Sequence, residues 1–160
     1  MQANPLQQHR WLTKLVGSWT YQQTCSMGPE QPEWTGSGTE LVRSVGDLWI
    51  VLEGRGDMPD GAAMATRMTL GFDPLKDRFV GSFVASMMTY QWLYEGTLDD
   101  AGRILSLQST GPSHKDDGTM ANYIDAVTIV SDDHRIFSSR TQGDDGTWKD
   151  FMVSHYHRVA

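Results

Sequence analysis

The sequence predicts an all-β protein in which about ten antiparallel strands follow one another as a meander and close into a barrel, with a short N-terminal helix as its lid. Three observations predict this fold. Apolar and polar residues alternate with a period of two from Gly17 onward, as is typical of strands. Short turns rich in Gly, Asp and Pro separate the alternating segments. No helical pattern of about 10–15 residues lies between any two of them, which argues against parallel strand–helix–strand units.

The helix is expected over residues 4–16. Asn4 can cap free backbone N–H groups, and Pro5 suits the first helical position. Apolar residues then recur at helical spacing, namely Trp11, Leu12, Leu15 and Val16. Gly17 supplies the left-handed conformation that commonly ends helices. A helix this short must pack on something larger, which is why we expect it on the barrel.

The barrel is expected over residues 17–158. Its first strand alternates around Trp19 and Tyr21, and the others are expected at residues 39–45, 48–56, 65–72, 79–88, 91–98, 104–109, 123–130, 136–141 and 148–158. Turns at 73–77, 99–102, 131–134 and 143–146 have the length that joins antiparallel neighbours, while 28–32 and 112–118 are longer loops. A barrel is favoured over a sandwich because closure removes the exposed edges of a long meander.

Length and charge limit the classes of function. At 160 residues the chain fits one domain, residues 1–160, with enough length to bury a core. It carries 13 basic and 20 acidic residues and a net charge of −7, so neither nucleic acid nor an anionic membrane surface is an expected partner. The one cysteine, Cys25, fits a reducing compartment, and no signal-peptide pattern is visible. We therefore expect a cytoplasmic protein.

The two ends of the predicted barrel resemble those of lipocalins and fatty-acid-binding proteins. Gly17-Ser18-Trp19, which follows the helix and opens the first strand, is similar to their Gly-x-Trp motif. This resemblance implies that a basic residue near the end of the chain covers the tryptophan, and Arg158 is the candidate. Gly17, Trp19 and Arg158 are thus expected to close the barrel, and a guanidinium over an indole face contributes about 0.5–2 kcal/mol.

Nearly the whole chain also resembles a bacterial family called domain of unknown function 1579. The matching segments are Leu15-Val16-Gly17-Ser18-Trp19, Gly71-Phe72-Asp73-Pro74, Phe79-Val80-Gly81, Ser86-Met87-Met88-Thr89, Tyr94-Glu95-Gly96, Gly111-Pro112, Asp145-Gly146-Thr147-Trp148 and His155-Tyr156-His157-Arg158. The resemblance implies a lipocalin-like (calycin-type) barrel. It supplies no active site that could be carried over to this chain.

Aromatic and methionine side chains occupy the faces that should turn inward. The candidates for a pocket wall are Tyr21, Met68, Met87, Trp92, Tyr94 and Tyr123. Two interpretations stay open, because a barrel of this size can fill itself with side chains or keep a cavity. Gln23 and Asp125 share these inward faces, and water in a cavity would relieve the cost of about 1–3 kcal/mol for burying an unpaired polar group.

His155 and His157 on the last strand point the same way, so both could bind one metal ion such as zinc. The remaining histidines fall in a predicted helix, loop and turn, where nothing places them nearby: His9, His114 and His134. Barrels similar to nitrobindin bind haem through a histidine on a late strand, which makes His155 a haem candidate. However, if Arg158 turns inward toward Trp19, His155 turns outward unless a bulge intervenes.

No catalytic residue is assigned. The sequence lacks nucleophile-elbow, P-loop and dinucleotide motifs, and Cys25 is expected to be a small buried hydrophobe. We therefore expect non-enzymatic binding of a small, largely apolar ligand, which enters at the end opposite the helix and needs no cofactor. Alternatives are a metal- or haem-dependent enzyme that uses His155 and His157, and a structural module that forms a homodimer through a covered outer face near Trp49.

Overall fold

Each strand of the chain pairs with its neighbours in sequence, and the last strand pairs with the first, so the sheet closes into an antiparallel barrel. The computed structural model describes residues 2–159. Its elements are α1 (Gln7–Thr13), β1 (Gly17–Cys25), β2 (Trp34–Val45), β3 (Trp49–Asp57), β4 (Ala63–Asp73), β5 (Arg78–Ala85), β6 (Trp92–Leu98), β7 (Ile104–Pro112), β8 (Met120–Ser131), β9 (His134–Gln142) and β10 (Trp148–Arg158). The predicted ten-stranded meander and its closure are confirmed.

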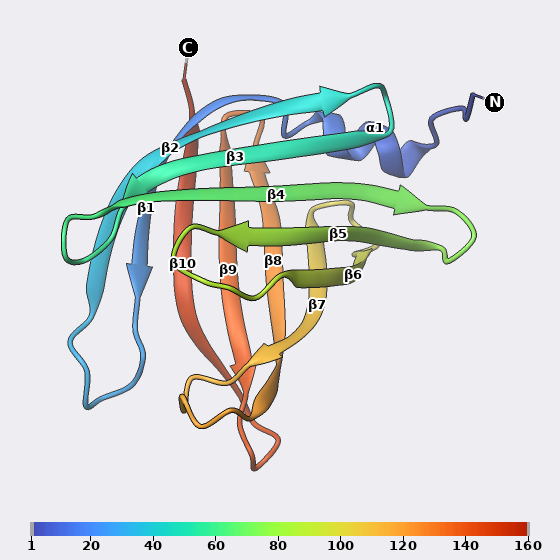
Figure 1. Ribbon diagram of the computed structural model, residues 1–160. Coiled ribbons are helices and arrows are strands. Elements are labelled where there is room, and N and C mark those ends of the chain that lie inside the picture. Colours follow the sequence, from blue (N-terminus) through green and yellow to red (C-terminus); the bar gives the residue numbers. More distant parts are fainter. Residues whose placement is uncertain (1, 160) are drawn as a thin grey trace.

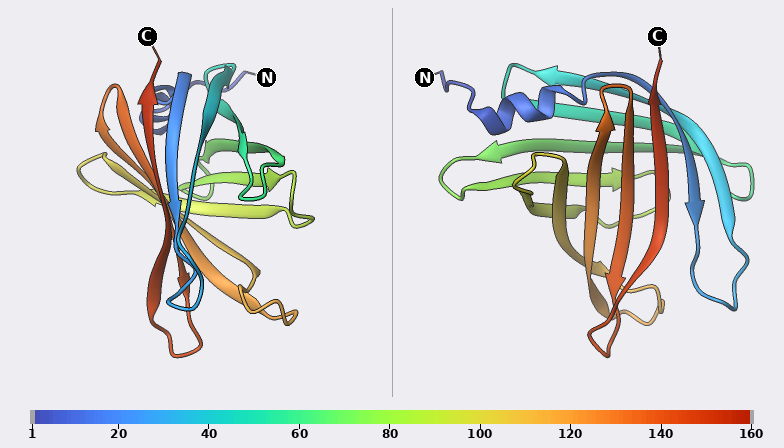
Figure 2. Two further views of the ribbon diagram at one scale, coloured as in Figure 1. Left: turned by 90° about the vertical axis from the view of Figure 1, so that its left-hand side faces the viewer. Right: turned by 180° about the vertical axis from the view of Figure 1, so that it is seen from behind.

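The strands form two layers that cross each other. Figure 1 shows β3–β6 running across the direction of β7–β10, and β2 bending from one direction into the other. The two views in Figure 2 show the same two layers from the side and from behind. Because side chains alternate between the faces of a strand, each layer turns one row of side chains toward the other layer. The space between these rows is where both the core and a ligand site must lie.

The predicted alternation is visible residue by residue. In β1, Trp19 and Tyr21 are buried while Thr20 and Gln22 are exposed. Leu107 and its alternate neighbours in β7 are likewise buried. The alternation of apolar and polar residues along each of these strands therefore determines which side chains the barrel encloses.

The N-terminal helix begins later than predicted. It spans Gln7–Thr13 rather than residues 4–16, so Asn4 and Pro5 lie before it. The side chain that bonds to the start of the helix is His9, whose Nδ1 accepts the Leu6 N–H at 2.9 Å. A histidine inside the first turn thus replaces the cap expected from Asn4, because it satisfies a backbone donor that the first turn leaves free.

The helix also ends earlier, at Thr13, four residues before Gly17. After Thr13 the chain continues as a tightened turn, in which the Leu15 and Val16 N–H groups donate to carbonyls three residues earlier. Gly17 consequently opens β1 instead of ending the helix. Within residues 2–159, the structure contains no helix long and apolar enough to span a membrane.

Two polar contacts fix α1 across one end of the barrel. The His9 ring bonds through Nε2 to the Phe72 carbonyl at 3.0 Å, and the Trp11 indole N–H donates to the Gly102 carbonyl at 2.7 Å. His9 accepts at Nδ1 from Leu6, so Nε2 is the protonated nitrogen of a neutral ring. α1 therefore closes the end of the barrel where β4 and β6 finish.

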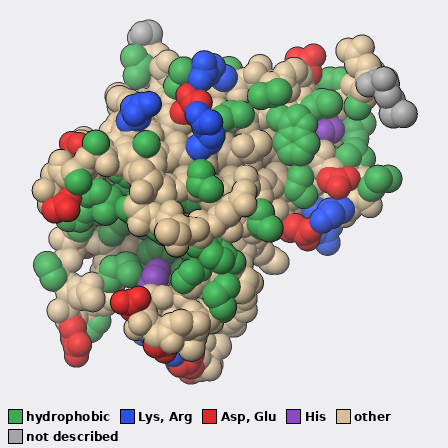
Figure 3. Space-filling view, viewed as in Figure 1, with side chains coloured by type: hydrophobic (Ala, Val, Ile, Leu, Met, Phe, Trp, Pro, Cys, Tyr) green, Lys and Arg blue, Asp and Glu red, His purple; other side chains and the backbone are tan. Residues whose placement is uncertain are grey.

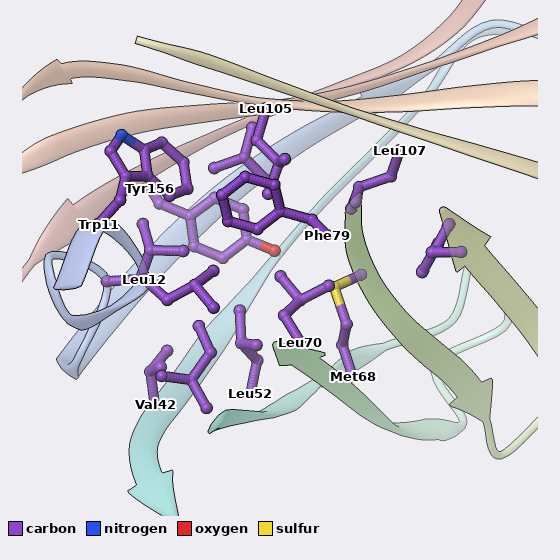
Figure 4. Close-up of a cluster of buried hydrophobic side chains, with 14 of the residues drawn as sticks. Trp11, Leu12, Val42, Leu52, Met68, Leu70, Phe79, Leu105, Leu107 and Tyr156 are labelled. Carbon is purple, nitrogen blue, oxygen red and sulfur yellow. The ribbon is translucent and has the colours of Figure 1, made fainter. Parts of the chain in front are cut away.

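The hydrophobic core fills this helix end. Figure 4 shows Trp11 and Leu12 of α1 together with Leu70, Phe79 and Leu105 from the strands. All five are buried, and the rings of Trp11 and Phe79 meet edge to face with centroids 6.1 Å apart. Burying one large apolar side chain stabilises the fold by about 1.5–3 kcal/mol. Packing at the helix end thus leaves the opposite end as the place for an open interior.

β2 begins at Trp34, five residues before the predicted start at 39. The sequence did not indicate this first half of the strand, because it contains two glycines. Glycine is depleted in strands, which hid this half from the sequence pattern. A Cβ at Gly38 would lie 2.5 Å from the Tyr21 hydroxyl oxygen, so the absence of a side chain makes room for Tyr21. The glycine that weakens the local strand signal is therefore required by a contact with the neighbouring strand.

The residues expected to close the barrel lie together. The Arg158 guanidinium lies 4.3 Å from the centre of the Trp19 ring, and it donates to the carbonyls of Val16 at 2.6 Å and Lys14 at 2.9 Å. Gly17 has a φ of +139°, and a Cβ there would lie 2.4 Å from Arg158 Nη1. Arg158 thus joins the segment after α1 to the seam between β1 and β10.

A candidate ligand cavity

A cavity of about 600 Å³ lies inside the barrel and opens at the end away from α1, here called the open end. Figure 3 shows hydrophobic side chains gathered around a hollow between the strand ends of this region. The outer lining comes from the loop after β5 and the segment after β7, and includes Met88 and Ser113. The inner lining comes from mid-strand residues such as Leu52 and Tyr156. Small-molecule sites in proteins have volumes of about 300–1,000 Å³, so the cavity is large enough for an organic ligand.

Five aromatic rings form a continuous wall on one side of the opening. Going from ring to ring, the centroids of Tyr90, Trp92, Tyr123, His114 and Phe151 are separated by 5.1, 4.9, 5.5 and 4.7 Å. All four contacts are edge to face, the arrangement that aromatic quadrupoles favour. Each ring in the wall therefore packs on at least one other ring of the wall.

All the residues named from the sequence as pocket candidates line this cavity: Tyr21, Met68, Met87, Trp92, Tyr94 and Tyr123. Their depths differ. Met87 lies in the turn after β5 and is 47% exposed, so it belongs to the rim, whereas Met68 and Tyr94 are buried. Met64, Met88 and Met152 also line the cavity. Methionine side chains are flexible and polarizable, which lets this lining adapt to a ligand's shape.

His114 is a lining residue that the sequence did not indicate. It lies just after β7, in the loop predicted at 112–118, and its ring packs against Tyr123 and Phe151. Burial lowers the pKa of His114, so the imidazole contributes to the wall as a neutral ring. The contact depends on how the loop folds back over the open end, for which the sequence carries no signal.

The main polar group in the cavity is the carboxyl of Asp125. The Tyr94 hydroxyl donates to Asp125 Oδ2 at 2.5 Å, and Ser139 lies opposite Asp125 across the β8–β9 pair. Burial raises the pKa of Asp125, while hydrogen bonds from Ser139 and Tyr94 act in the opposite direction. The same burial, together with the neighbouring carboxylate, raises the pKa of Tyr94, so its hydroxyl keeps its proton.

A buried ion pair lies in the wall of the cavity. Glu40 accepts a hydrogen bond from Arg135, whose side chain is almost fully buried. The Arg135 guanidinium lies 4.7 Å from the Trp19 ring centre and 3.9 Å from that of Tyr156. Glu40 lines the cavity, and Arg135 lies behind it. Sequence alternation could have located Glu40, which shares the inward face of Val42, but not its partner.

Ser109 has a buried hydroxyl without a partner. The residue is 8% exposed, lines the cavity, and makes no hydrogen bond through Oγ. It lies beside the place where strand pairing is shortest, because β6 and β7 pair only from Glu95↔Gln108 to Leu98↔Leu105. Beyond that register the strands diverge, and the Tyr90 hydroxyl reaches across to the Thr110 carbonyl at 2.8 Å. Ser109 thus offers a hydrogen-bonding group to whatever occupies the cavity.

The histidines of the last strand lie on the outside of the barrel. His155 and His157 are exposed, while Ser154 and Tyr156 between and beside them are buried. The placement of His134 differs from our expectation: it opens β9 opposite His157, and its Nε2 lies 3.0 Å from His155 Nδ1. Its ring stacks on both partners, since strand pairing brings the residue that we placed in a turn to their side.

Within residues 2–159, the structure has no group of three His, Cys, Asp or Glu side chains arranged to hold a metal ion. The outward direction of His155 and His157 also separates them from the cavity, so a haem or metal enclosed there would not meet them. Trp49, named for a covered outer face, lies over Gly71 on the outside of β3 and β4 and is 40% exposed. Homodimer formation through this face stays a prediction.

Comparison with known proteins gives a family and a fold. The family model described as "Protein of unknown function (DUF1579)" matches residues 4–158. No curated protein matches the chain. Among solved structures, Rv2717c from M. tuberculosis is similar with a TM-score of 0.68 and 13% identity, over 98% of this chain and 100% of that one.

Two further structures show the same barrel. The S-type phycobiliprotein lyase CPES from Guillardia theta has a TM-score of 0.66 and 13% identity, over 98% of this chain and 99% of that one. EF1p2_mFAP2b bound to DFHBI has a TM-score of 0.51 and 14% identity, over 95% of this chain and 99% of that one. At these identities the similarity establishes the calycin-like barrel fold.

Proposed function

The chain belongs to the DUF1579 family of proteins of unknown function, and we propose that it binds a small, largely apolar ligand in the cavity of its barrel without catalysing a reaction on it. One observation carries this proposal: the cavity has walls of aromatic and methionine side chains and only a few polar groups, at defined positions. That combination is typical of small-molecule sites, where apolar surface supplies affinity and a few polar groups fix the orientation.

The barrel geometry supports the same conclusion. α1 and the core close one end, so a ligand would enter through the open end, past Met88 and His114. The rings of the aromatic wall pack against one another, and lining side chains that are already packed lower the ordering cost of binding. Similarity to a barrel that has been solved with DFHBI bound adds that this fold is compatible with an organic ligand.

The proposal is tested by titrating the protein with 1-pyrenemethanol, a neutral, flat fluorescent probe, and following pyrene emission. We expect saturable binding of one probe per chain. Met68→Trp fills the interior from β4 and should weaken binding at least about tenfold. Val84→Trp adds the same bulk to the exposed face of β5 and should leave binding unchanged. Absence of saturation, or equal affinities of the two variants, would contradict the proposal.

A further inference from the structure

The charged groups that line the cavity are both acidic. Glu40 and Asp125 contribute carboxyl groups, and within residues 2–159 no lysine or arginine belongs to the lining. Arg135 neutralises Glu40 from behind the wall. In the described part of the chain, the partners of Asp125 are the neutral hydroxyls of Tyr94 and Ser139. An anionic ligand would therefore meet a carboxyl group inside the cavity and no compensating cation.

Asp125 retains unused hydrogen-bonding capacity. A carboxylate has about four lone-pair positions, and Tyr94 and Ser139 engage two of them. Tyr94 and Ser139 act as donors to this group, so the free positions call for a further donor. A ligand N–H group would supply it, and a positively charged one would also balance the buried charge.

Ser109 provides an independent sign that the cavity is built to receive a polar group. On the inner face, Asp125 pairs with Leu107, and Ser109 is the next inward residue along β7. Diagonal neighbours of this kind lie about 7–8 Å apart, a distance that one polar substituent and the ring carrying it can span. A native structure leaves few buried hydroxyls unpaired, and Ser109 Oγ is one of them. The orphaned hydroxyl and the free carboxylate positions therefore face the same volume.

The aromatic wall favours the same kind of ligand. Trp92 and Tyr123 meet edge to face at 4.9 Å, and both line the cavity together with Asp125, which lies two positions after Tyr123 in β8. Aromatic faces attract cations as well as other flat rings. A flat body on this wall would carry its polar substituent inward toward the carboxyl group.

On these grounds, which rest on the binding function proposed above, we propose that the cavity selects a flat aromatic ligand that bears an amine or a similar N–H donor, with Asp125 as its anchor and Ser109 as a second polar contact. Carboxylate ligands such as fatty acids are disfavoured by the same two carboxyl groups. The structure thus assigns the ligand class by charge and hydrogen bonding.

Three probes with the same flat body test the assignment at pH 7: 1-pyrenylmethylamine, which is cationic, 1-pyrenemethanol, which is neutral, and 1-pyrenecarboxylate, which is anionic. For the wild-type protein we expect the amine to bind most tightly and the carboxylate most weakly, with at least about a tenfold difference between them. Affinity for the amine should rise with pH as Asp125 ionises, because its pKa is raised by burial.

Asp125→Asn should weaken amine binding about tenfold or more and change alcohol binding little. Asp150→Asn removes the same charge from an exposed position of β10 outside the cavity, and serves as the control. If the alcohol binds but the amine has no advantage, or if the two Asn variants behave alike, the ligand class is wrong while the binding function stands. If none of the probes binds saturably to the wild-type protein, the binding function itself fails and the ligand class fails with it.

Discussion

Replacing Glu40 by Leu is expected to lower the free energy of unfolding by about 3 kcal/mol. The substitution leaves the Arg135 guanidinium buried between Trp19 and Tyr156 without its carboxylate. Breaking a buried pair in this way costs about 3–5 kcal/mol, because a guanidinium cannot lose its proton. We take the lower end of the range because Glu40 borders the cavity, so water there can partly solvate the arginine.

A second substitution separates the loss of the pair from the loss of packing. Adding Arg135→Met to Glu40→Leu removes the stranded charge and replaces it with an apolar side chain that still contacts Trp19. Exchange of a whole buried pair for apolar residues is often neutral or stabilising. We therefore expect the double variant to regain most of the lost stability, to within about 1 kcal/mol of the wild type.

Urea unfolding followed by tryptophan fluorescence measures these differences, and thermal unfolding should show Glu40→Leu melting roughly 6–12 °C lower, since about 1 kcal/mol corresponds to about 2–4 °C at this chain length. The control is Glu53→Leu, because Glu53 pairs with Arg43 and Arg67 on the outer face. This variant should lose at most about 1 kcal/mol of unfolding free energy. The reasoning is refuted if Glu40→Leu costs no more than the control, or if the double variant is as unstable as Glu40→Leu alone.

Three further predictions concern single positions. Gly17→Ala should cost roughly 1–3 kcal/mol more than Gly28→Ala in chemical unfolding, since both have a positive φ but only the first places a Cβ against Arg158; equal losses would show that the contact carries no weight. Asp125→Asn should be more stable than the wild type at pH 7. The folded-state pKa of Asp125 is raised, so the wild type loses stability as pH rises above about 4, and the two proteins should converge below that pH; a pH-independent difference in thermal unfolding would speak against this. Ser109→Ala should keep or slightly raise the stability of the ligand-free protein, by about 1 kcal/mol at most, because the lost hydroxyl has no hydrogen-bond partner. A clear loss of stability in urea unfolding would show that the hydroxyl does have a partner.

The strands could be predicted because each carries its own evidence. In β7, for example, inward residues such as Leu105 and outward residues such as Gln108 alternate without interruption. β2 shows where this evidence ends, because Gly38 makes way for Tyr21 on another strand and so follows from a contact that local pattern does not contain. The predicted start of the helix was wrong for a similar reason. His9, which lies within the helix, accepts the Leu6 N–H, and its orientation is set by a hydrogen bond to the distant Phe72 carbonyl.

The cavity lining was predictable to the extent that it depends on alternation. Inward direction follows from the period of two, which is why Tyr94 and Tyr123 were identified. Pairing between distant strands does not follow from it, so Arg135 was not linked to Glu40, 95 positions earlier in the chain. His134 shows the same limit, because the bulge between β8 and β9 and the register with β10 decide its neighbours.

The seam between β1 and β10 has a consequence for how the molecule is made. Val16 and Arg158, which it brings together, stand 142 positions apart, and contacts of such separation slow folding because a long stretch of chain must be ordered first. During synthesis, β1 has one edge without a partner until Trp148–Arg158 has been added. The barrel therefore cannot close until β10 has been made, and any sheet formed before then leaves one edge of β1 open to association with other chains.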